Sequence, residues 1–180
     1  MLKGQGSSDT RELVVLQGAA LLVLSGVASD EFTGQAMMND VLDNGEALAK
    51  FKQMCLAQGV SQPDVELLIT EPTKLLANSK QITSIESTSQ GYVSAITSMT
   101  LAEIARNHGA GRFAMEDTII PEIGFEILVE RGQAINQGET WIKIHHNIDL
   151  TAQEKQALTE SIIISSKPIE AKPRLIEIIR

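Results

Sequence analysis

The sequence lacks several features that mark particular classes of protein. It has a single cysteine, Cys55, so an internal disulfide is impossible, which fits a reducing compartment. It has no cluster of basic residues, and its formal net charge of −8 argues against a nucleic-acid or anionic-membrane partner. This charge does not exclude small anions, because one local pocket of amides or cations can bind phosphate on an acidic protein.

The sequence also lacks a long uninterrupted apolar run. Residues 1–6 carry no apolar signal-peptide core. The longest apolar stretch, residues 13–27, is interrupted by polar and glycine positions and is too short to span a bilayer comfortably. We therefore expect a soluble, cytoplasmic chain with no membrane partner. Its 180 residues, 43% of them apolar, are enough for one ordinary domain or two small ones.

The first third of the chain predicts helices over residues 9–28, 33–42 and 46–58. The first begins with a capping pair, Asp9 and Glu12, and ends near Gly26; the third stops at Gly59. Residues 13–27 are apolar on most sides of the first helix, which predicts that it packs inside a larger body. Three helices in succession do not make a complete α/β domain, so they need a partner surface that this sequence does not supply.

The pattern changes after residue 80. Residues 60–80 contain Pro63 and Pro72 and are predicted to be a linking region. Short strands are predicted within 82–96 and over 124–129, 140–145 and 161–165. Helices are predicted over 100–107 and 151–160, opened by the pairs Thr100 with Glu103 and Thr151 with Glu154. The expected fold class is α/β (α+β), with domains at 1–79 and 80–180.

Two glycines predict sharp corners in the second domain. Gly132 and Gly138 bracket one apolar residue, Ile135, which we expect to point inward. This pattern resembles half of a barrel-sandwich hybrid, the fold of biotinyl and lipoyl carrier domains, with residues 82–96 as the other half. A carrier presents a lysine at the tip that joins the halves, but the inserted segment here, residues 97–122, contains none. Lys80, Lys143, Lys155 and Lys167 lie elsewhere and none is in a Met-Lys-Met setting, so a carrier domain is disfavoured.

A barrel-sandwich hybrid interrupted by a helix resembles the C-terminal domain of the pyrimidine nucleoside phosphorylases, a family that includes the thymidine phosphorylases. The resemblance extends over nearly the whole chain. It rests on Leu2–Gly6, Asp9, Arg11–Leu13, Phe51–Met54, Ala57–Gly59, Gly91–Ile96, Gly109–Arg112, Asp117 and Gly124–Ile144. Thr140–His145 and Ser165–Pro168 look closer to the animal than to the bacterial enzymes. The chain departs from the family at His108, where leucine is usual, and at Ile119–Pro121, where an acidic residue is frequent.

The resemblance implies a fold, a reaction and partners. Residues 1–79 would be late helices of the central α/β domain, and residues 80–180 the C-terminal domain. The family converts thymidine and phosphate to thymine and 2-deoxyribose 1-phosphate, without a cofactor, as a homodimer formed through an N-terminal helical region. The family's lysine, histidine and serine cluster and its glycine-rich signature match no segment here. We therefore assign no catalytic, substrate-binding, phosphate-binding or metal residue, and expect this chain to be inactive alone. The alternative from another class is a non-catalytic interaction module.

A few residues still need weighing as candidate site residues. Gly109–Arg112 combines amides with an arginine, as a phosphate loop does, but a helix end followed by a turn, with Arg112 in an ion pair, is the favoured interpretation. His145 and His146 point to opposite faces of a strand and are expected at a surface or interface rather than on one metal ion. His108 lies at a helix end, where its charged form suits the helix dipole. Cys55 and Trp141 are expected to be core residues rather than a nucleophile and a base-stacking platform.

Overall fold

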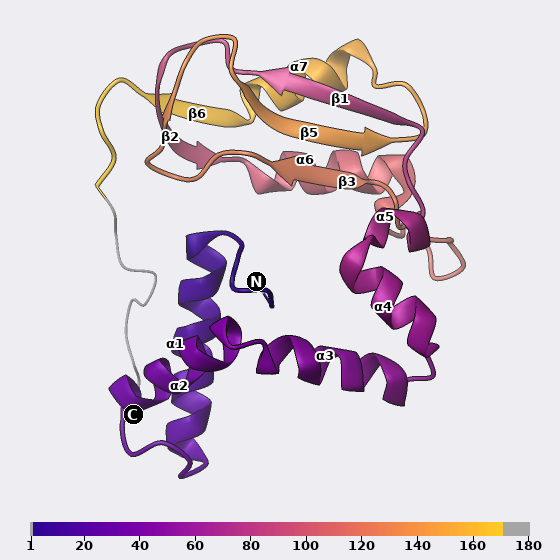
Figure 1. The fold of residues 1–180 in the computed structure, drawn as a ribbon. Helices are drawn as coiled ribbons and strands as arrows, with labels where there is room; N and C mark the ends of the chain where they lie inside the picture. Colours follow the sequence, from indigo (N-terminus) through magenta and orange to yellow (C-terminus); the bar gives the residue numbers. More distant parts are fainter. Residues whose placement is uncertain (1, 171–180) are drawn as a thin grey trace. The chain divides into compact units, whose positions relative to one another are not determined.

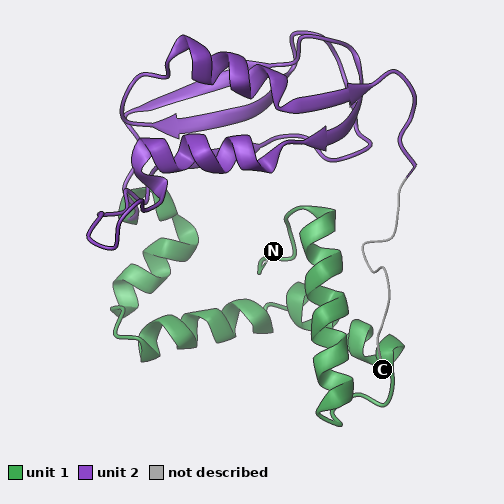
Figure 2. Cartoon of the chain, turned by 180° about the vertical axis from the view of Figure 1, so that it is seen from behind, with its two compact units in different colours: residues 1–75, 174–180 green, residues 76–173 purple. Residues whose placement is uncertain are grey.

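The structure is a computed structural model that describes residues 2–170. Within this range the chain forms two compact units, residues 2–75 and 76–170, shown in different colours in Figure 2. The first unit is helical, and the second combines helices with two small antiparallel sheets. The expected mixed helix and strand class is therefore confirmed.

The first unit consists of helices α1 (Ser8–Leu24), α2 (Glu31–Asp43), α3 (Glu46–Ala57), α4 (Gln62–Thr70) and α5 (Pro72–Leu75) (Figure 1). The first three were predicted, but the capping pair expected for α1 is wrong. Ser7 is the N-cap and Asp9 lies inside the first turn, where a carboxylate still favours the helix dipole. For α2, the N-cap is Asp30, whose side chain accepts a hydrogen bond from the Thr33 amide at 2.8 Å.

The prediction of a linking region over residues 60–80 is wrong for its first part, which forms α4 and α5. Ser61 caps α4 by accepting from the Asp64 amide, and Pro63 lies in the first turn. Pro72 is the first residue of α5. Proline is tolerated in the first turn because the amide that it lacks would be unpaired there. Both prolines therefore mark helix starts and do not indicate a linking region.

Helices α1 and α2 pack closely because two small residues meet. Gly34 of α2 lies against Ala19 of α1, and a Cβ at Gly34 would lie 3.0 Å from the Ala19 backbone. Arg11 ties the helices together at one end through two hydrogen bonds to the Asp43 carboxylate, at 2.7 and 2.8 Å. Hydrogen bonding from Arg11 lowers the pKa of Asp43. Asn39 also accepts from Arg11, at 2.9 Å, so this guanidinium is engaged in holding the two helices together.

The second unit contains six strands, two helices and one wide helical turn. In chain order these are β1 (Gln81–Glu86), β2 (Gly91–Ile96), α6 (Ser98–Ala105), the turn η1 (Arg106–Ala110), β3 (Gly124–Ile127), β4 (Ala134–Ile135), β5 (Thr140–His146), α7 (Ala152–Glu160) and β6 (Ile162–Ser165). One sheet has the order β1-β5-β3 and the other β4-β2-β6. Neighbouring strands in both sheets are antiparallel.

Strands from before and after the inserted segment share each sheet. In the first sheet Ile85 of β1 pairs with Ile142 of β5, and in the second Val93 of β2 pairs with Ile164 of β6. The expected two halves, 82–96 and 124–144, are therefore interleaved. Within residues 76–170 the strands form two small antiparallel sheets and no closed barrel.

The predicted glycine corners are present. Gly132 and Gly138 have φ of +89° and +80°, values that favour glycine, and Ile135 between them is 1% exposed. At Gly91 the reason for glycine is different, because a Cβ there would collide with the carbonyl oxygen of Ser165 on the paired strand β6. Glycine therefore permits this close approach of the two strands.

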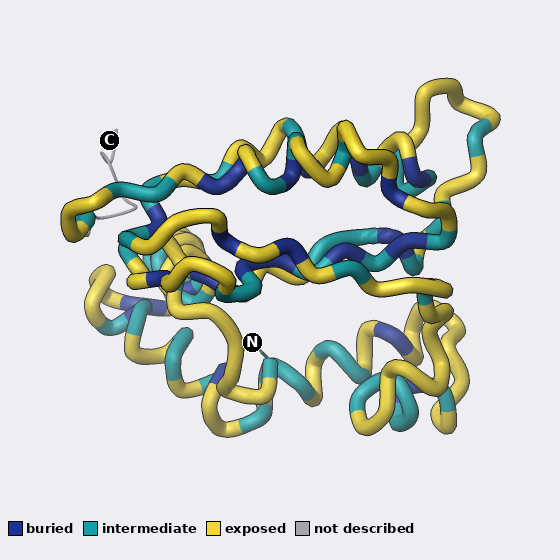
Figure 3. Tube along the Cα trace, turned by 90° about the horizontal axis from the view of Figure 1, so that it is seen from above, coloured by how far each residue is buried: buried dark blue, intermediate teal, exposed yellow. Residues whose placement is uncertain are grey.

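One apolar core joins the two sheets and both helices. Its members come from all of these elements: Ile85, Val93, Leu101, Ile104, Val129, Ile135, Trp141, Ile142, Ile144, Leu150, Leu158 and Ile162. Helices α6 and α7 lie side by side over the strands (Figure 2). Figure 3 shows buried positions along the strands and on the helices.

The two capping predictions for this unit have different outcomes. The N-cap of α6 is Thr97 and the helix starts at Ser98, so the predicted capping pair of Thr100 and Glu103 is wrong. The predicted capping box of Thr151 and Glu154 at the start of α7 is confirmed.

The contact between Gly34 and Ala19 gives a test of the first unit. Gly34→Val inserts three carbon atoms where even a Cβ is crowded, and we expect it to lower the free energy of unfolding by about 1–3 kcal/mol. Ala36→Val, on an exposed position of the same helix, is the matched control and carries only the change in helix propensity. Urea unfolding followed by circular dichroism measures both; equal effects of the two substitutions would contradict the proposed packing.

Candidate functional site

Candidate sites for chemistry are the three histidines, the glycine loop after α6 and a pocket in the first unit. The first is a buried pair between η1 and α7. His108 is 6% exposed, and its Nε2–H donates to the Glu154 carboxylate at 3.1 Å. The same carboxylate accepts from the Thr151 amide at 2.9 Å through its other oxygen, completing the capping box. Glu154 therefore connects the end of the inserted helix to the start of α7.

The ionised form of Glu154 is favoured in the fold. Partial burial raises the pKa of Glu154, but the hydrogen bonds from Thr151 and the charge and hydrogen bond of His108 together outweigh it, and the pKa of Glu154 is lowered. The Nδ1 atom of His108 is buried and has no hydrogen-bond partner among residues 2–170. The pair therefore connects η1 to α7, and no described group is bonded to Nδ1 of His108 that could pass on a proton.

His146 is a core residue that packs near His108. The two rings are edge to face with centroids 6.2 Å apart. His146 Nδ1–H donates to the Ile148 carbonyl at 2.8 Å, which fixes the tautomer, so Nε2 accepts from the Thr83 hydroxyl at 2.8 Å. The expectation of a surface or interface position is therefore wrong for His146, which is 1% exposed because β5 is central in its sheet. His145 is half-buried on the opposite face, with Nδ1 3.4 Å from the Ser79 hydroxyl.

The loop after α6 has a structural explanation. Gly109 ends the helical turn with φ of +103°, a conformation that favours glycine, and its carbonyl accepts from the Ile120 amide at 2.8 Å, closing the loop. Inside the loop, the Asp117 carboxylate accepts from the amides of Phe113 and Ala114, and these bonds lower the pKa of Asp117. The two amides that directly follow Gly109–Arg112 are therefore already bonded to a carboxylate of the chain itself.

Arg112 differs from its expected role. Its side chain is exposed, and no ion pair joins it to any residue that the structure describes. The nearby cation that does have a partner is Arg106, which lies 4.3 Å above the Phe113 ring. The predicted helix end and turn are therefore present, whereas the predicted ion pair of Arg112 is not found among residues 2–170.

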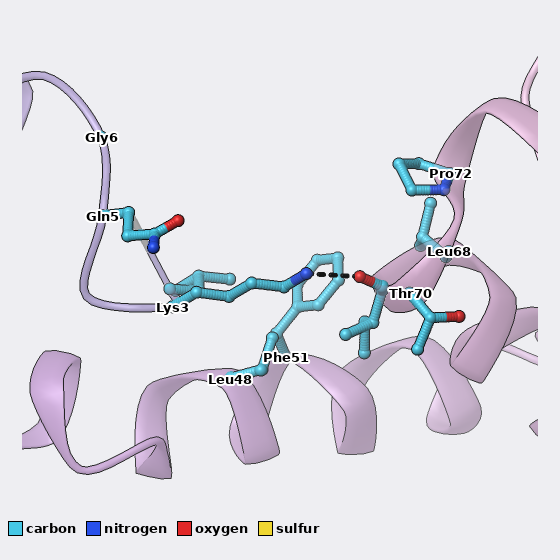
Figure 4. A pocket seen from close by; sticks show the side chains of 10 residues that line it. Lys3, Gln5, Gly6, Leu48, Phe51, Leu68, Thr70 and Pro72 are labelled. Carbon is cyan, nitrogen blue, oxygen red and sulfur yellow. Dashed lines mark hydrogen bonds between the residues drawn. The ribbon is translucent and has the colours of Figure 1, made fainter.

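A pocket of about 450 Å³ in the first unit contains one cation. Figure 4 shows the Lys3 side chain extending across it, past Phe51, to a backbone oxygen at the end of α4. This oxygen is the carbonyl of Ile69, and Lys3 donates to it at 2.5 Å. Lysine at the last turn of a helix satisfies a free carbonyl and suits the dipole, so this side chain has a structural role.

The remaining candidates lie in the two cores. Cys55 is 7% exposed and Trp141 is fully buried, so both are core residues as predicted. Between residues 2 and 170, no three or more His, Cys, Asp or Glu side chains are grouped to hold a metal ion. In the same range no helix has the length and apolar character needed to cross a membrane.

The comparisons with known proteins all indicate the same family. The model of the pyrimidine nucleoside phosphorylase C-terminal domain matches residues 92–165. Thymidine phosphorylase of Rattus norvegicus is 32% identical over 99% of this chain, and that of Homo sapiens is 31% identical over 96%. Pyrimidine-nucleoside phosphorylase of Geobacillus stearothermophilus is 34% identical over 97%. The chain belongs to the pyrimidine nucleoside phosphorylase family and corresponds to the C-terminal portion of its members.

The match to the pyrimidine nucleoside phosphorylases takes up a much larger share of this chain than of its relatives. It includes nearly all of this chain but only 39% of the Rattus and Geobacillus relatives and 37% of the human one. The identities to animal and bacterial relatives are too similar to support the predicted preference for the animal enzymes. The assignment of residues 1–79 and 80–180 to two domains of the family stays a prediction, and residues 171–180 lie outside the described range.

The pairing of His108 with Glu154 was not predicted from the sequence. Both residues were noticed separately, His108 as a departure from the family's usual leucine and Glu154 as a capping residue. They are 46 positions apart, and only the packing of η1 against α7 brings them together. A buried histidine is costly unless a partner accepts its N–H, so the departure itself indicated that an acceptor lies nearby.

The lowered pKa of Glu154 predicts how its contribution depends on pH. The stabilisation from Glu154 is fully present above the pKa that this group has in the unfolded chain, about 4.3. It is lost as the pH falls through the lower pKa of Glu154 in the folded chain. Glu154→Gln should therefore lower the free energy of unfolding by about 1–2 kcal/mol at neutral pH and by progressively less below pH 4. Glu116→Gln, on an exposed loop position, is the matched control. A pH-independent loss in Glu154→Gln, measured by urea unfolding, would disprove the ionic contribution.

The exposed position of Arg112 predicts that it contributes little. Arg112→Gln should change the free energy of unfolding by no more than about 0.5 kcal/mol. Phosphate titration followed by ³¹P NMR should give the same weak, unsaturated response for this variant and for the unchanged chain. Saturable binding that Arg112→Gln removes would restore the phosphate-loop hypothesis.

Proposed function

We propose that this chain is the C-terminal part of a thymidine phosphorylase, a pentosyltransferase of the cytoplasm that acts as a homodimer. The reaction is thymidine plus phosphate to thymine plus 2-deoxyribose 1-phosphate. In this proposal the residues that hold phosphate and protonate the leaving base lie outside the chain. The chain contributes supporting structure against which the reaction centre is assembled, which supplies the positioning that such a transfer needs.

The observation that carries this proposal is the extent of the match. Three relatives named as thymidine or pyrimidine-nucleoside phosphorylases align with at least 96% of this chain, and the alignment takes up 37–39% of their lengths. A free-standing module shared among proteins would match a compact unit, whereas this alignment includes the helical unit as well as the sheet unit. The pairing of the two units in one alignment supports a portion of one larger enzyme.

The chemistry of the described residues is consistent with an inactive lobe. Phosphorolysis needs several donors that converge on phosphate and an acid or cation for the departing base. Here Arg11 is taken up by Asp43, Lys3 by a helix end and His108 by Glu154. Each of these groups holds parts of the fold together, which favours a structural role over a catalytic one.

The alternative, a non-catalytic interaction module, predicts little exposed apolar surface on the helices. The first unit instead exposes several large apolar side chains, among them Leu21, Leu24 and Phe32. A stable independent module would avoid such a patch. This observation favours the enzyme-portion proposal over the module.

The proposal predicts inactivity alone and activity when joined to the rest of the enzyme. The purified chain should release no thymine from thymidine in the presence of phosphate. We define the joined protein as the upstream part of the Geobacillus relative, which this chain does not match, followed by residues 1–180. The joined protein should release thymine in a phosphate-dependent manner, measured by the change in ultraviolet absorbance. Activity of the isolated chain, or a folded but inactive joined protein, would refute the proposal.

A further inference from the structure

The turn between α2 and α3 contains an asparagine that is followed by a glycine. Asn44 is the C-cap of α2 and Gly45 is the N-cap of α3, so these two residues join the helices (Figure 1). Asn44 is exposed. Gly45 has φ of +90°, and a Cβ built on it would meet no atom beyond its chain neighbours within 4 Å. The peptide bond between the two residues is therefore open on the side where most residues carry a side chain.

Asparagine is a chemically labile residue, and its side chain reacts with the main chain that follows it. We propose that Asn44 is a modification site that converts to aspartate and isoaspartate. The Gly45 nitrogen attacks Cγ of Asn44, so that a new C–N bond forms and the bond from Cγ to Nδ2 breaks. The side-chain nitrogen leaves as ammonia with the proton of the Gly45 amide, and a succinimide ring remains. Water then opens the ring at one carbonyl to give aspartate or at the other to give isoaspartate, in which the main chain runs through Cγ.

The following glycine distinguishes Asn44 from the other asparagines of the chain. Asn44 is the only asparagine in the sequence that precedes a glycine. A Cβ on the following residue crowds the forming ring and restricts the rotations that bring the nitrogen to Cγ, and glycine removes this restriction. Asn136 is also exposed but precedes Gln137, so it offers the same side chain without this freedom. The chain therefore contains its own control.

The folded turn slows this reaction without blocking it. Oδ1 of Asn44 accepts from the Glu46 amide at 2.9 Å, and Nδ2 donates to the Asp40 carboxylate at 3.4 Å. The Asn44 ψ of −7° keeps the Gly45 nitrogen away from Cγ, so ring closure requires rotation about the Cα–C bond of Asn44. Both hydrogen bonds are exposed, and water replaces such bonds at a small net cost in free energy. The conversion is therefore expected in the folded chain, at a lower rate than in the unfolded chain.

The isoaspartate product alters the junction of the two helices. Main-chain hydrogen bonds lie on both sides of the reacting bond, from the Asn44 amide to the Asp40 carbonyl at 2.8 Å and from the Ala49 amide to the Gly45 carbonyl at 3.0 Å. An extra main-chain carbon between these bonds shifts the end of α2 relative to the start of α3. The modification therefore loosens the first unit, and this inference does not depend on the proposed function.

The test follows the asparagines of the folded chain during incubation in mildly alkaline buffer. Peptide mapping by mass spectrometry should find conversion at Asn44 at least about tenfold faster than at Asn136, because glycine follows only the former. The rate at Asn44 should rise with pH, since the Gly45 nitrogen attacks after it has lost its proton. Asn44→Gln should show no conversion at this position, because its longer side chain forms the corresponding ring far less readily. Equal rates at Asn44 and Asn136, or an unchanged Asn44, would overturn the inference.

A second measurement separates the lengthened main chain from the added charge. Chromatography isolates the isoaspartate form, and urea unfolding compares it with Asn44→Asp, which carries the same charge on an unaltered main chain. The isoaspartate form should unfold at a lower urea concentration than Asn44→Asp. Equal midpoints would show that the longer main chain leaves the junction of α2 and α3 intact, and would disprove the structural consequence.

Discussion

The second unit depends on strand pairing across a long insertion. β1 and β2 follow each other in the chain, yet they pair with β5 and with β6 in different sheets. This arrangement brings Val93, Ile135 and Ile142 into one core and fixes the positions of α6 and α7 above it. Closing such long-range pairs costs chain entropy, which the burial of large residues such as Trp141 offsets. The sheets hold both ends of the inserted segment, and its helix α6 contributes Leu101 and Ile104 to the same core.

Polar groups inside this unit act as ties between elements. His146 connects β5 to β1 through Thr83, and Glu154 connects α7 to η1 through His108. Each tie is made where burial would otherwise leave a polar group unpaired. In the first unit, Arg11 and Asp43 connect α1 to α2 at a more exposed position. Several cationic and imidazole groups that could suggest a reaction centre thus hold structural elements together, whereas Arg112 is exposed and the Nδ1 atom of His108 has no hydrogen-bond partner among residues 2–170.

Much of the second unit was predictable because its signals are local. Alternating apolar residues and glycines predicted the strands and the inward position of Ile135, and Thr151 with Glu154 predicted the start of α7. The capping pairs of Asp9 and Thr100 failed because the same spacing also occurs within a first helical turn. Residues 62–75 were misjudged because proline starts a helix as readily as it ends one. The burial of His146 and its contact with His108 arise from tertiary packing, which no local pattern records.

The most direct test of this account is the pattern of cross-strand contacts in the isolated chain. Nuclear Overhauser effects between backbone protons report which strands are neighbours. The structure predicts contacts between Thr83 and Ile144 and between Val93 and Ile164, which join residues on either side of the insertion. Contacts between β1 and β2 as a simple hairpin, with residues 124–146 paired only among themselves, would contradict the interleaved sheets and remove the basis for the supporting lobe.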